Sequence, residues 1–292
     1  MRLRLHGRRL TLATIIAAVV LATIAISPAA AIRYGDNDGN AHPWVGLMVA
    51  QNADGNPLWR CSGTLLSSTV LLTAGHCVEP SKDAAQNPTH VEVWFSAGPI
   101  PLAAGYPAAG SHHCAGITGY PCTGDAGGTP VENPGWDPNR FWLHDDGLVI
   151  FDEPYTGTTT YGLLPDEEQL DSLHPGHGTT FTAVGYGLQL AFPDAASWKD
   201  QAVRVRKVAN PWLYSINQPL AGLPADGDLI LSDNASSGGT CFGDSGGPNF
   251  IGDSRVIAGV NSFVLNSNCA GLSGAYRIDH AADLEWIGSY LE

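Results

Sequence analysis

The chain has 292 residues, and its 28 acidic against 14 basic side chains give a net charge of −14 at pH 7. This acidic balance makes nucleic acid and anionic membranes poor partners, so no nucleic-acid partner is expected. The 35 glycines and 20 prolines, together with few charged residues, favour a globular protein rich in β-structure and turns. The length suits one large β domain or two fused barrels.

The N-terminus reads as a secretory signal peptide. The first ten residues carry four arginines and no acid, an uncharged apolar run of 16 residues extends from Thr11 to Ile26, and Ala29 and Ala31 form an A-x-A pattern. The run is shorter than the about 18 residues of a spanning helix. We therefore expect cleavage after Ala31, a secreted extracellular protein without a membrane partner, and a mature domain of residues 32–292. An uncleaved membrane anchor is the alternative.

Short apolar or alternating runs between turn signals follow along the chain. Such runs favour antiparallel barrels or sandwiches. Helical spacing is convincing only after His280, where Leu284, Ile287 and Leu291 can share one face. The sequence thus predicts an all-β body with one C-terminal helix. The expected strands are residues 44–50, 69–75, 90–97, 147–151, 179–187, 202–208, 228–232 and 255–263.

One long stretch breaks this pattern. From Gly98 to Phe141 the sequence is dominated by Gly, Pro, Ala, Ser and Asn, which predicts a long loop, and Cys114 and Cys122 within it favour a loop closed by a disulfide. Six cysteines in an exported chain are more often disulfide-bonded than metal-bound. They can pair in 15 ways, and cysteine counting alone does not choose among them.

The segment TCFGDSGGP, residues 240–248, sets Ser245 in a frame of glycines. Glycines permit a tight loop that presents a hydroxyl beside free N–H groups, although Gly-Asp-Ser also suits a plain surface turn. A serine nucleophile needs a general base and a group that orients the base. His76 ends an apolar strand beside Cys77, and Asp145 enters the apolar run GLVIF. Neighbouring strand residues face opposite ways, so only one of Asp145 and Asp146 can reach the base.

Three blocks, LTAGHC, DDGLVIF and CFGDSGGP, together resemble the signature segments of the trypsin-like, chymotrypsin-fold serine proteases. The similarity extends over residues 32–292, with CSGTLLSSTVLLTAGHC, AVGYG, GVNSFV and GAYRIDHAADLEWI resembling further parts of that family, and is interrupted by the long loop. It implies two packed antiparallel six-stranded β-barrels, a C-terminal helix, and an active site between the barrels.

The resemblance also implies the chemistry. Ser245 attacks the scissile carbonyl, His76 transfers the proton, and Asp145 orients His76. The N–H groups of Gly243 and Ser245 form the oxyanion hole. No cofactor and no metal are expected. The substrates are proteins or peptides, and a monomer is expected.

For the pocket that receives the side chain before the cleaved bond, the resemblance points to Gly239, Thr240, Ser262, Val264 and Gly274. Gly239 stands where a trypsin carries a carboxylate, so a basic side chain finds no counter-ion there. Val264 should narrow the slot. We therefore expect cleavage after small or medium apolar residues, with aromatic preference as the runner-up.

Activation in the family pairs a new N-terminal amine with the acid before the nucleophile. The resemblance thus implies an ion pair between Ile32 and Asp244, although IRYG departs from the usual Ile-Val-Gly-Gly and whether a separate activation step exists stays open. The extra residues between His76 and Asp145 are expected to overhang the cleft. The resemblance pairs Cys61 with Cys77, Cys241 with Cys269, and Cys114 with Cys122.

Two other function classes compete with an active protease. A catalytically inactive protease-like binding protein is the first, but the chain retains all three triad residues. A metal-dependent hydrolase is the second, suggested by HHC at residues 112–114, but no ligand frame such as H-E-x-x-H accompanies it. The triplet NAS at 234–236 fits N-glycosylation at Asn234.

Overall fold

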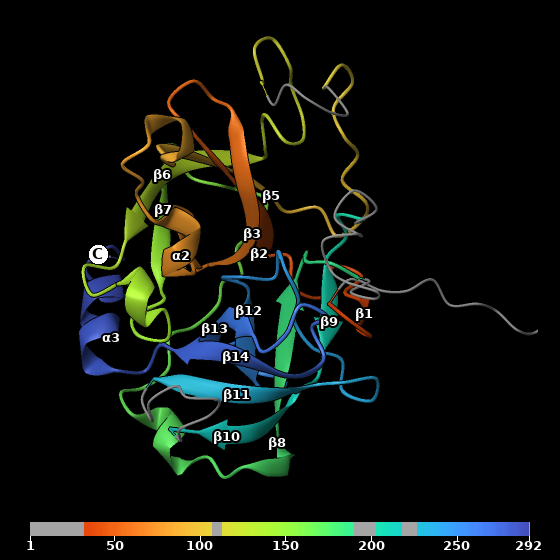
Figure 1. The fold of residues 1–292 in the computed structure, drawn as a ribbon, viewed down its shortest axis with the longest axis vertical. Helices are drawn as coiled ribbons and strands as arrows, with labels where there is room; N and C mark the ends of the chain where they lie inside the picture. The colour runs from red at the N-terminus through yellow and green to blue at the C-terminus, as the bar shows by residue number, and fades with distance from the viewer. Residues whose placement is uncertain (1–31, 107–112, 190–202, 218–226, 292) are drawn as a thin grey trace, which may run out of the picture.

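The apolar runs of the N-terminal half form a closed six-stranded barrel in the computed structural model, which describes residues 32–106, 113–189, 203–217 and 227–291. All its neighbouring strands are antiparallel, in the order β2-β3-β4-β7-β6-β5. It occupies the upper, orange to green part of Figure 1. The strands are β2 (Val45–Gln51), β3 (Pro57–Leu65), β4 (Val70–Thr73), β5 (His90–Trp94), β6 (Ala126–Glu132) and β7 (Gly147–Phe151).

The C-terminal half forms a second antiparallel barrel, in the lower part of Figure 1. Its sheet runs β8-β10-β11-β14-β13-β12, and pairing of β12 with β8 closes the ring, while β9 and β1 extend from β8. The strands are β8 (Gly176–Gly185), β10 (Trp212–Ile216), β11 (Asp228–Asp233), β12 (Pro248–Ile251), β13 (Ile257–Val264) and β14 (Gly271–Arg277), with β9 (Lys207–Ala209) and β1 (Asp36–Asn37) beside them. The predicted all-β fold of two six-stranded barrels is confirmed.

One apolar cluster joins the two barrels. It contains Leu71 and Leu72 of β4 together with Phe250 of β12 and Val260 of β13, all fully or almost fully buried. A second cluster, with Leu229 and its neighbours, fills the second barrel alone. Because burial of apolar area is the main driving force of packing, the joint cluster holds the facing ends of the barrels together.

Short helices complete the fold. The helix α2 (Gly75–Val78) follows β4, α3 (Ala281–Gly288) ends the chain, and 3₁₀ turns cover residues 84–86, 138–140 and 169–172. The predicted C-terminal helix is confirmed, but its buried face is not the predicted one. Ile287 and Asp283 are buried, Leu284 is half-buried, and Leu291 is exposed. Leu291 lies beyond the end of the helix, so it no longer shares the face of Ile287.

Two sequence predictions about strands are corrected. The stretch 98–141 contains β6, whose glycines and proline hid a strand that two neighbours complete. A Cβ on Gly128 would lie 2.4 Å from the Ile150 carbonyl oxygen, so only glycine allows this close pairing. The expected strand at 202–208 is reduced to β9. Residue 202 lies outside the described residues. Arg206 precedes β9, and its buried side chain donates to Asp38 and to the carbonyl oxygen of Val45.

Among the residues that the structure describes, no helix is long and apolar enough to cross a membrane. The predicted signal peptide, residues 1–31, lies outside them.

Candidate active site

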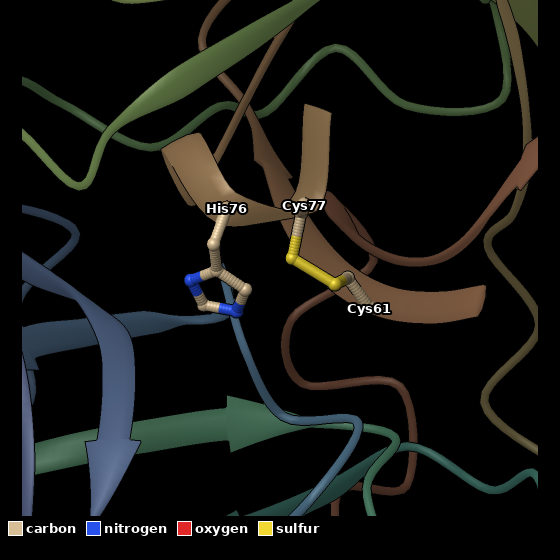
Figure 2. Close-up of side chains that lie close together, drawn as sticks. All are labelled: Cys61, His76 and Cys77. Carbon is tan, nitrogen blue, oxygen red and sulfur yellow. A yellow bond between two sulfur atoms is a disulfide. The ribbon is translucent and has the colours of Figure 1, made fainter. Parts of the chain in front are cut away.

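His76 is presented by the short helix α2, directly after β4. The neighbouring Cys77 is bonded to Cys61 of β3, and the Trp59 indole N–H donates to the Cys77 carbonyl oxygen at 2.9 Å. Figure 2 shows the His76 ring projecting from the helix toward the blue chain of the C-terminal half, while Cys77 turns to the disulfide. The crosslink therefore fixes the backbone from which the imidazole is aimed between the barrels.

Asp145 orients this imidazole. Its side chain is 0% exposed and accepts the His76 backbone N–H at 2.9 Å through Oδ1. His76 Nδ1 lies 2.9 Å from Asp145 Oδ2, and because a carboxylate only accepts, Nδ1 carries the proton and Nε2 is left free as the base. The Ser262 hydroxyl donates to the same Oδ2 at 2.5 Å. These contacts hold one tautomer and one ring orientation.

Asp145 and Asp146 lie directly before β7 instead of within it, and Asp146 contacts residues other than His76. Its Oδ1 accepts from the Asn133 side chain at 2.9 Å, and the carboxyl is fully buried. Burial and the charge of nearby Asp283 raise its pKa well above the ordinary value. Asp146 therefore belongs to the packing between β6, β7 and α3, away from His76.

The pKa of His76 is raised above its ordinary value. Burial by itself lowers it, but the negative charge of Asp145 and the hydrogen bond to it outweigh burial. A base needs the neutral ring, so the proton must be lost before His76 can accept one from a nucleophile. The contact with Asp145 thus makes the imidazole a stronger base than a free histidine.

Ser245 lies on a loop that is pressed against the end of β4. Its carbonyl oxygen accepts the Ser62 N–H at 2.8 Å. The next residue, Gly246, has φ +76°, and a Cβ there would lie 2.1 Å from Thr73 Oγ1 and 2.6 Å from the Ala74 nitrogen. Only glycine fits at this position. Gly246 contacts Ala74, which lies two residues before His76 in the sequence. Among the described residues, no hydrogen bond joins the Ser245 hydroxyl to His76.

The backbone N–H groups of this loop differ in whether they donate a hydrogen bond; those that donate none are called open. The N–H groups of Asp244, Gly246 and Gly247 donate to backbone carbonyl oxygens at 3.0, 2.8 and 2.9 Å. Those of Gly243 and Ser245 donate to no acceptor within the described residues. Gly243 has φ +96°, which a side chain disfavours. Two unengaged donors next to one hydroxyl are what an oxyanion-binding site requires.

A cavity of about 60 Å³ lies beside Ser245 and is lined in part by Thr240, Ser262 and Val264. Two of the predicted pocket residues lie outside its lining. Gly274 lies under the ring of Phe263, because a Cβ at Gly274 would meet that ring at 2.2 Å. Gly239 instead contacts the side chain of Asp233. Sequence reasoning singled out neither Phe263, although it lies within GVNSFV, nor Asp233, which no motif marks.

Asp244 turns away from the hydroxyl into the protein. Its carboxylate accepts the N–H groups of Gly187 at 2.7 Å and Cys241 at 2.9 Å. Burial raises the pKa of Asp244 to about 7, although both hydrogen bonds lower it. Ile32 is fully buried among Ala183 and Ala209, and its nitrogen is in a peptide bond to Ala31 in this chain. The charged amine of the expected ion pair is therefore absent from the unprocessed chain.

The three disulfides of the structure join Cys61 to Cys77, Cys114 to Cys122, and Cys241 to Cys269. These are the pairs that the resemblance implies. The last pair packs beside Val264, at the cavity.

The Cys114–Cys122 loop does not lie at the cavity. The Gln51 side chain donates to the Cys122 carbonyl oxygen at 2.9 Å, and the Tyr120 ring meets the edge of Trp94, on β2 and β5. A later part of the predicted loop comes to the site, because Phe141 contacts Phe263 with ring centroids 5.5 Å apart. The long stretch thus divides between two places.

Two groups of described residues bring three potential metal ligands together. In the first, His76 with Cys61 and Cys77, both sulfurs are consumed by the disulfide. The second group is His144, Asp146 and Asp283, in which His144 Nδ1 lies 2.8 Å from Asp283 and the Asn133 side chain donates to both Asp146 and Asp283. Of the histidine pair at 112–113, His112 lies outside the described residues and His113 is exposed.

A family model and a curated relative match this sequence. The family model described as Trypsin matches residues 129–287, more than half of the chain, including Asp145 and Ser245. The CLIP domain-containing serine protease B10 of Anopheles gambiae is 24% identical over 259 residues, which are 84% of this chain and 65% of that protein. The chain thus spans just under two thirds of that relative's length.

Two solved structures share the fold. The structure of HL collagenase is 19% identical with a TM-score of 0.62, and the match covers 90% of this chain and 98% of that one. Human heparin binding protein is 19% identical with a TM-score of 0.54, over 86% of this chain and 92% of that one.

Proposed function

Because this chain belongs to the trypsin family, we propose that it is a secreted serine endopeptidase that uses His76, Asp145 and Ser245 as its catalytic triad. The observation that carries the proposal is the pairing of an oriented imidazole with a loop that leaves two N–H groups open. His76 Nδ1 is held 2.9 Å from Asp145, and the amides of Gly243 and Ser245 have no acceptor among the described residues.

The proposed reaction has two halves. The Ser245 oxygen attacks the scissile carbonyl while its proton moves to His76 Nε2, and the negative oxygen is stabilised by the N–H groups of Gly243 and Ser245, at about 3 kcal/mol for each donor. His76 gives the proton to the leaving amine, which leaves an acyl-enzyme. Water then attacks the acyl group, again losing its proton to His76. Asp145 keeps the imidazole in the required tautomer and stabilises its charged form.

The mature enzyme is proposed to be residues 32–292, exported after cleavage behind Ala31 and acting as a monomer on protein or peptide substrates, without nucleic acid or a membrane. The two barrels supply one part of the triad each. His76 and Asp145 lie at β4 and β7 of the first barrel, and Ser245 lies before β12 of the second. The site therefore exists only where the barrels meet.

Small or medium apolar residues before the cleaved bond are the preference that sequence analysis proposes. The shape argument is supported by Val264, which lines a cavity of only about 60 Å³. The argument that a basic side chain finds no counter-ion depends on Gly239 alone.

A protease-like binding protein is the second candidate, and the name of human heparin binding protein favours it as a use of this fold. In this chain the complete triad and the two open N–H groups favour catalysis instead. The net charge of −14 also opposes binding of a polyanion.

A serine-directed phosphonylating reagent tests the proposed function. We expect the secreted protein to lose peptidase activity in proportion to label bound, and peptide mapping to place that label on Ser245. A chelator should leave the activity intact. Labelling at another serine, or inactivation by the chelator alone, would contradict the proposed mechanism.

Activation is predicted to depend on the free amine of Ile32. After cleavage behind Ala31, that amine can pair with Asp244, whose buried carboxyl makes no ion pair within the described part of the chain. An ion pair there orders the loop that carries the open N–H groups. A protein with one extra alanine before Ile32 should therefore lose activity by about 100-fold, which corresponds to some 2.7 kcal/mol.

The control for this test is the same protein with Ile32 replaced by valine and no extension, which keeps the free amine. N-terminal sequencing must confirm both starts. Equal activity of the extended and the native protein would show that the amine does not operate the site.

A further inference from the structure

Asp233 carries a buried carboxyl that accepts no hydrogen bond from the described part of the chain. The residue is 0% exposed, and neither of its oxygens has a hydrogen-bond partner among the described residues. A buried polar group without a partner is costly, so it is usually either a strain reservoir or part of a site. Its location distinguishes these two cases.

The carboxyl lies on the inward face of β11 in the second barrel. Asp233 is the last residue of β11, and strand alternation places it on the same face as Leu229 and Leu231. Those two leucines belong to the barrel's core cluster. The next residues along the chain lead through Gly239 to Thr240, which lines the cavity beside Ser245.

Gly239 and Asp233 are in direct contact. A Cβ on Gly239 would lie 2.2 Å from both Cγ and Oδ1 of Asp233. In an aspartate side chain, Cγ lies about 1.5 Å from Cβ, the length of a carbon–carbon bond. The Asp233 carboxyl therefore lies directly against Gly239, as close to it as the carboxyl of a side chain at that position would be. The missing charge at position 239 is supplied from a different strand.

The charged groups around Asp233 leave it available. Arg33 pairs with Gly239 through its backbone, but its guanidinium donates to the Cys269 carbonyl oxygen at 2.7 Å and to Tyr34 at 2.9 Å. Burial raises the pKa of Asp233 to about 8, the charge of Arg33 opposes that rise, and the charge of Asp244 adds to it. A cation brought to this carboxyl would gain a buried ion pair.

We propose that Asp233 is a specificity-determining residue, which binds the cationic group of a lysine or arginine that precedes the cleaved bond. The inference rests on the proposed function and names its substrate class. The cavity does not reach the carboxyl in the structure, since Asp233 is not among its lining residues. Gly239 contacts the carboxyl and directly precedes Thr240 of the cavity lining, so entry of a basic side chain requires the chain at Gly239 to move.

This proposal replaces the apolar preference expected from the sequence. That preference assumed that a glycine at position 239 leaves the pocket without a counter-ion. A carboxylate from β11 in contact with that glycine removes the assumption, whereas the narrowing by Val264 remains and favours the unbranched stem of a basic side chain.

The test compares peptides that differ only in the residue before the cleaved bond, with Lys, Arg, Leu or Ala at that place. The native enzyme is expected to have a higher kcat/KM for Lys and Arg than for Leu. In Asp233→Asn, which keeps size and hydrogen-bonding atoms but not charge, kcat/KM for Lys and Arg should fall by about 100-fold, with Leu little changed. Faster cleavage after Leu than after Lys or Arg by the native enzyme would overturn the proposal.

A charge-conserving variant controls for general damage. Asp233→Glu keeps a carboxylate on β11, whereas Asp233→Asn removes the charge. Cleavage after Lys and Arg should be retained in part by Asp233→Glu and remain low in Asp233→Asn. Equal loss in both variants, with Leu cleavage intact, would argue against pairing with the carboxyl.

The pH dependence provides an independent readout. Because the cation binds the ionised carboxyl, the ratio of kcat/KM for Arg to that for Leu should rise as pH increases through about 8 and fall below it. The ratio cancels the titration of His76, which both substrates share. A ratio that does not change with pH, or that keeps its slope in Asp233→Asn, would count against the proposal.

Failure of this inference is distinguishable from failure of the proposed function. Labelling of Ser245 by the phosphonylating reagent does not require a basic side chain. Native enzyme that is labelled at Ser245 but prefers Leu refutes only the role of Asp233, whereas enzyme that is neither labelled nor active refutes the protease itself.

Discussion

Replacing Ser245 by alanine is expected to lower kcat for peptide hydrolysis by on the order of 10⁵- to 10⁶-fold, with KM little changed. In the proposed reaction the hydroxyl oxygen forms the bond to the scissile carbonyl, and Ser245 both lines the cavity and carries one of the two open N–H groups. Substrate binding uses the cavity and remains. The measurement is steady-state hydrolysis of a fluorogenic peptide, with burst-phase kinetics to detect the acyl-enzyme.

Ser289→Ala is the matched control for this variant. Ser289 is exposed after α3, and its hydroxyl donates only to the Trp286 carbonyl oxygen at 2.7 Å. Its activity should equal that of the native protein. Hydrolysis by Ser245→Ala at more than a few per cent of the native rate would mean that another group is the nucleophile.

Asp145→Asn is expected to have the next largest effect, a fall of about 10⁴-fold in kcat at neutral pH. An amide in place of the carboxylate presents a donor to His76 Nδ1, so the ring takes the opposite tautomer and Nε2 is no longer a base. It also removes the charge that raises the pKa of His76. The fold should be retained, which circular dichroism and thermal unfolding can check.

The adjacent Asp146→Asn provides a control that is matched in chemistry and burial. Asp146 contacts Asn133 instead of His76, so kcat should change little. Its pKa is raised in the folded state, so the native carboxyl retains a proton above the unfolded pKa and its contribution to stability falls as pH rises. Asp146→Asn should therefore stabilise the protein relative to native increasingly toward alkaline pH. If Asp146→Asn abolishes activity and Asp145→Asn does not, the two acids have been assigned in the wrong order.

The local sequence determined much of the chemistry. The glycines around Ser245 are required by close contacts such as those of Gly246 with Thr73 and Ala74. A sequence reveals such contacts because only glycine, which has no side chain, allows them. Asp145 and Asp146 have different partners, as predicted from strand alternation, but both residues precede β7 in the structure, so the chain before that strand sets their directions. Apolar runs such as GLVIF predicted their strands correctly, because a buried strand is recognised from its own composition without knowledge of the strands that pair with it.

Tertiary structure decided the rest, because those features depend on residues far apart in the chain. β6 has a loop-like composition and becomes a strand only between β5 and β7, where Gly128 allows close pairing. Arg206 lies outside its expected strand, and its side chain donates to Asp38, 168 residues away in the sequence. The contact of Asp233 with position 239 depends on packing for the same reason: a sequence shows which residue occupies position 239, but only the packing of β11 against that glycine brings the carboxyl of Asp233 next to it.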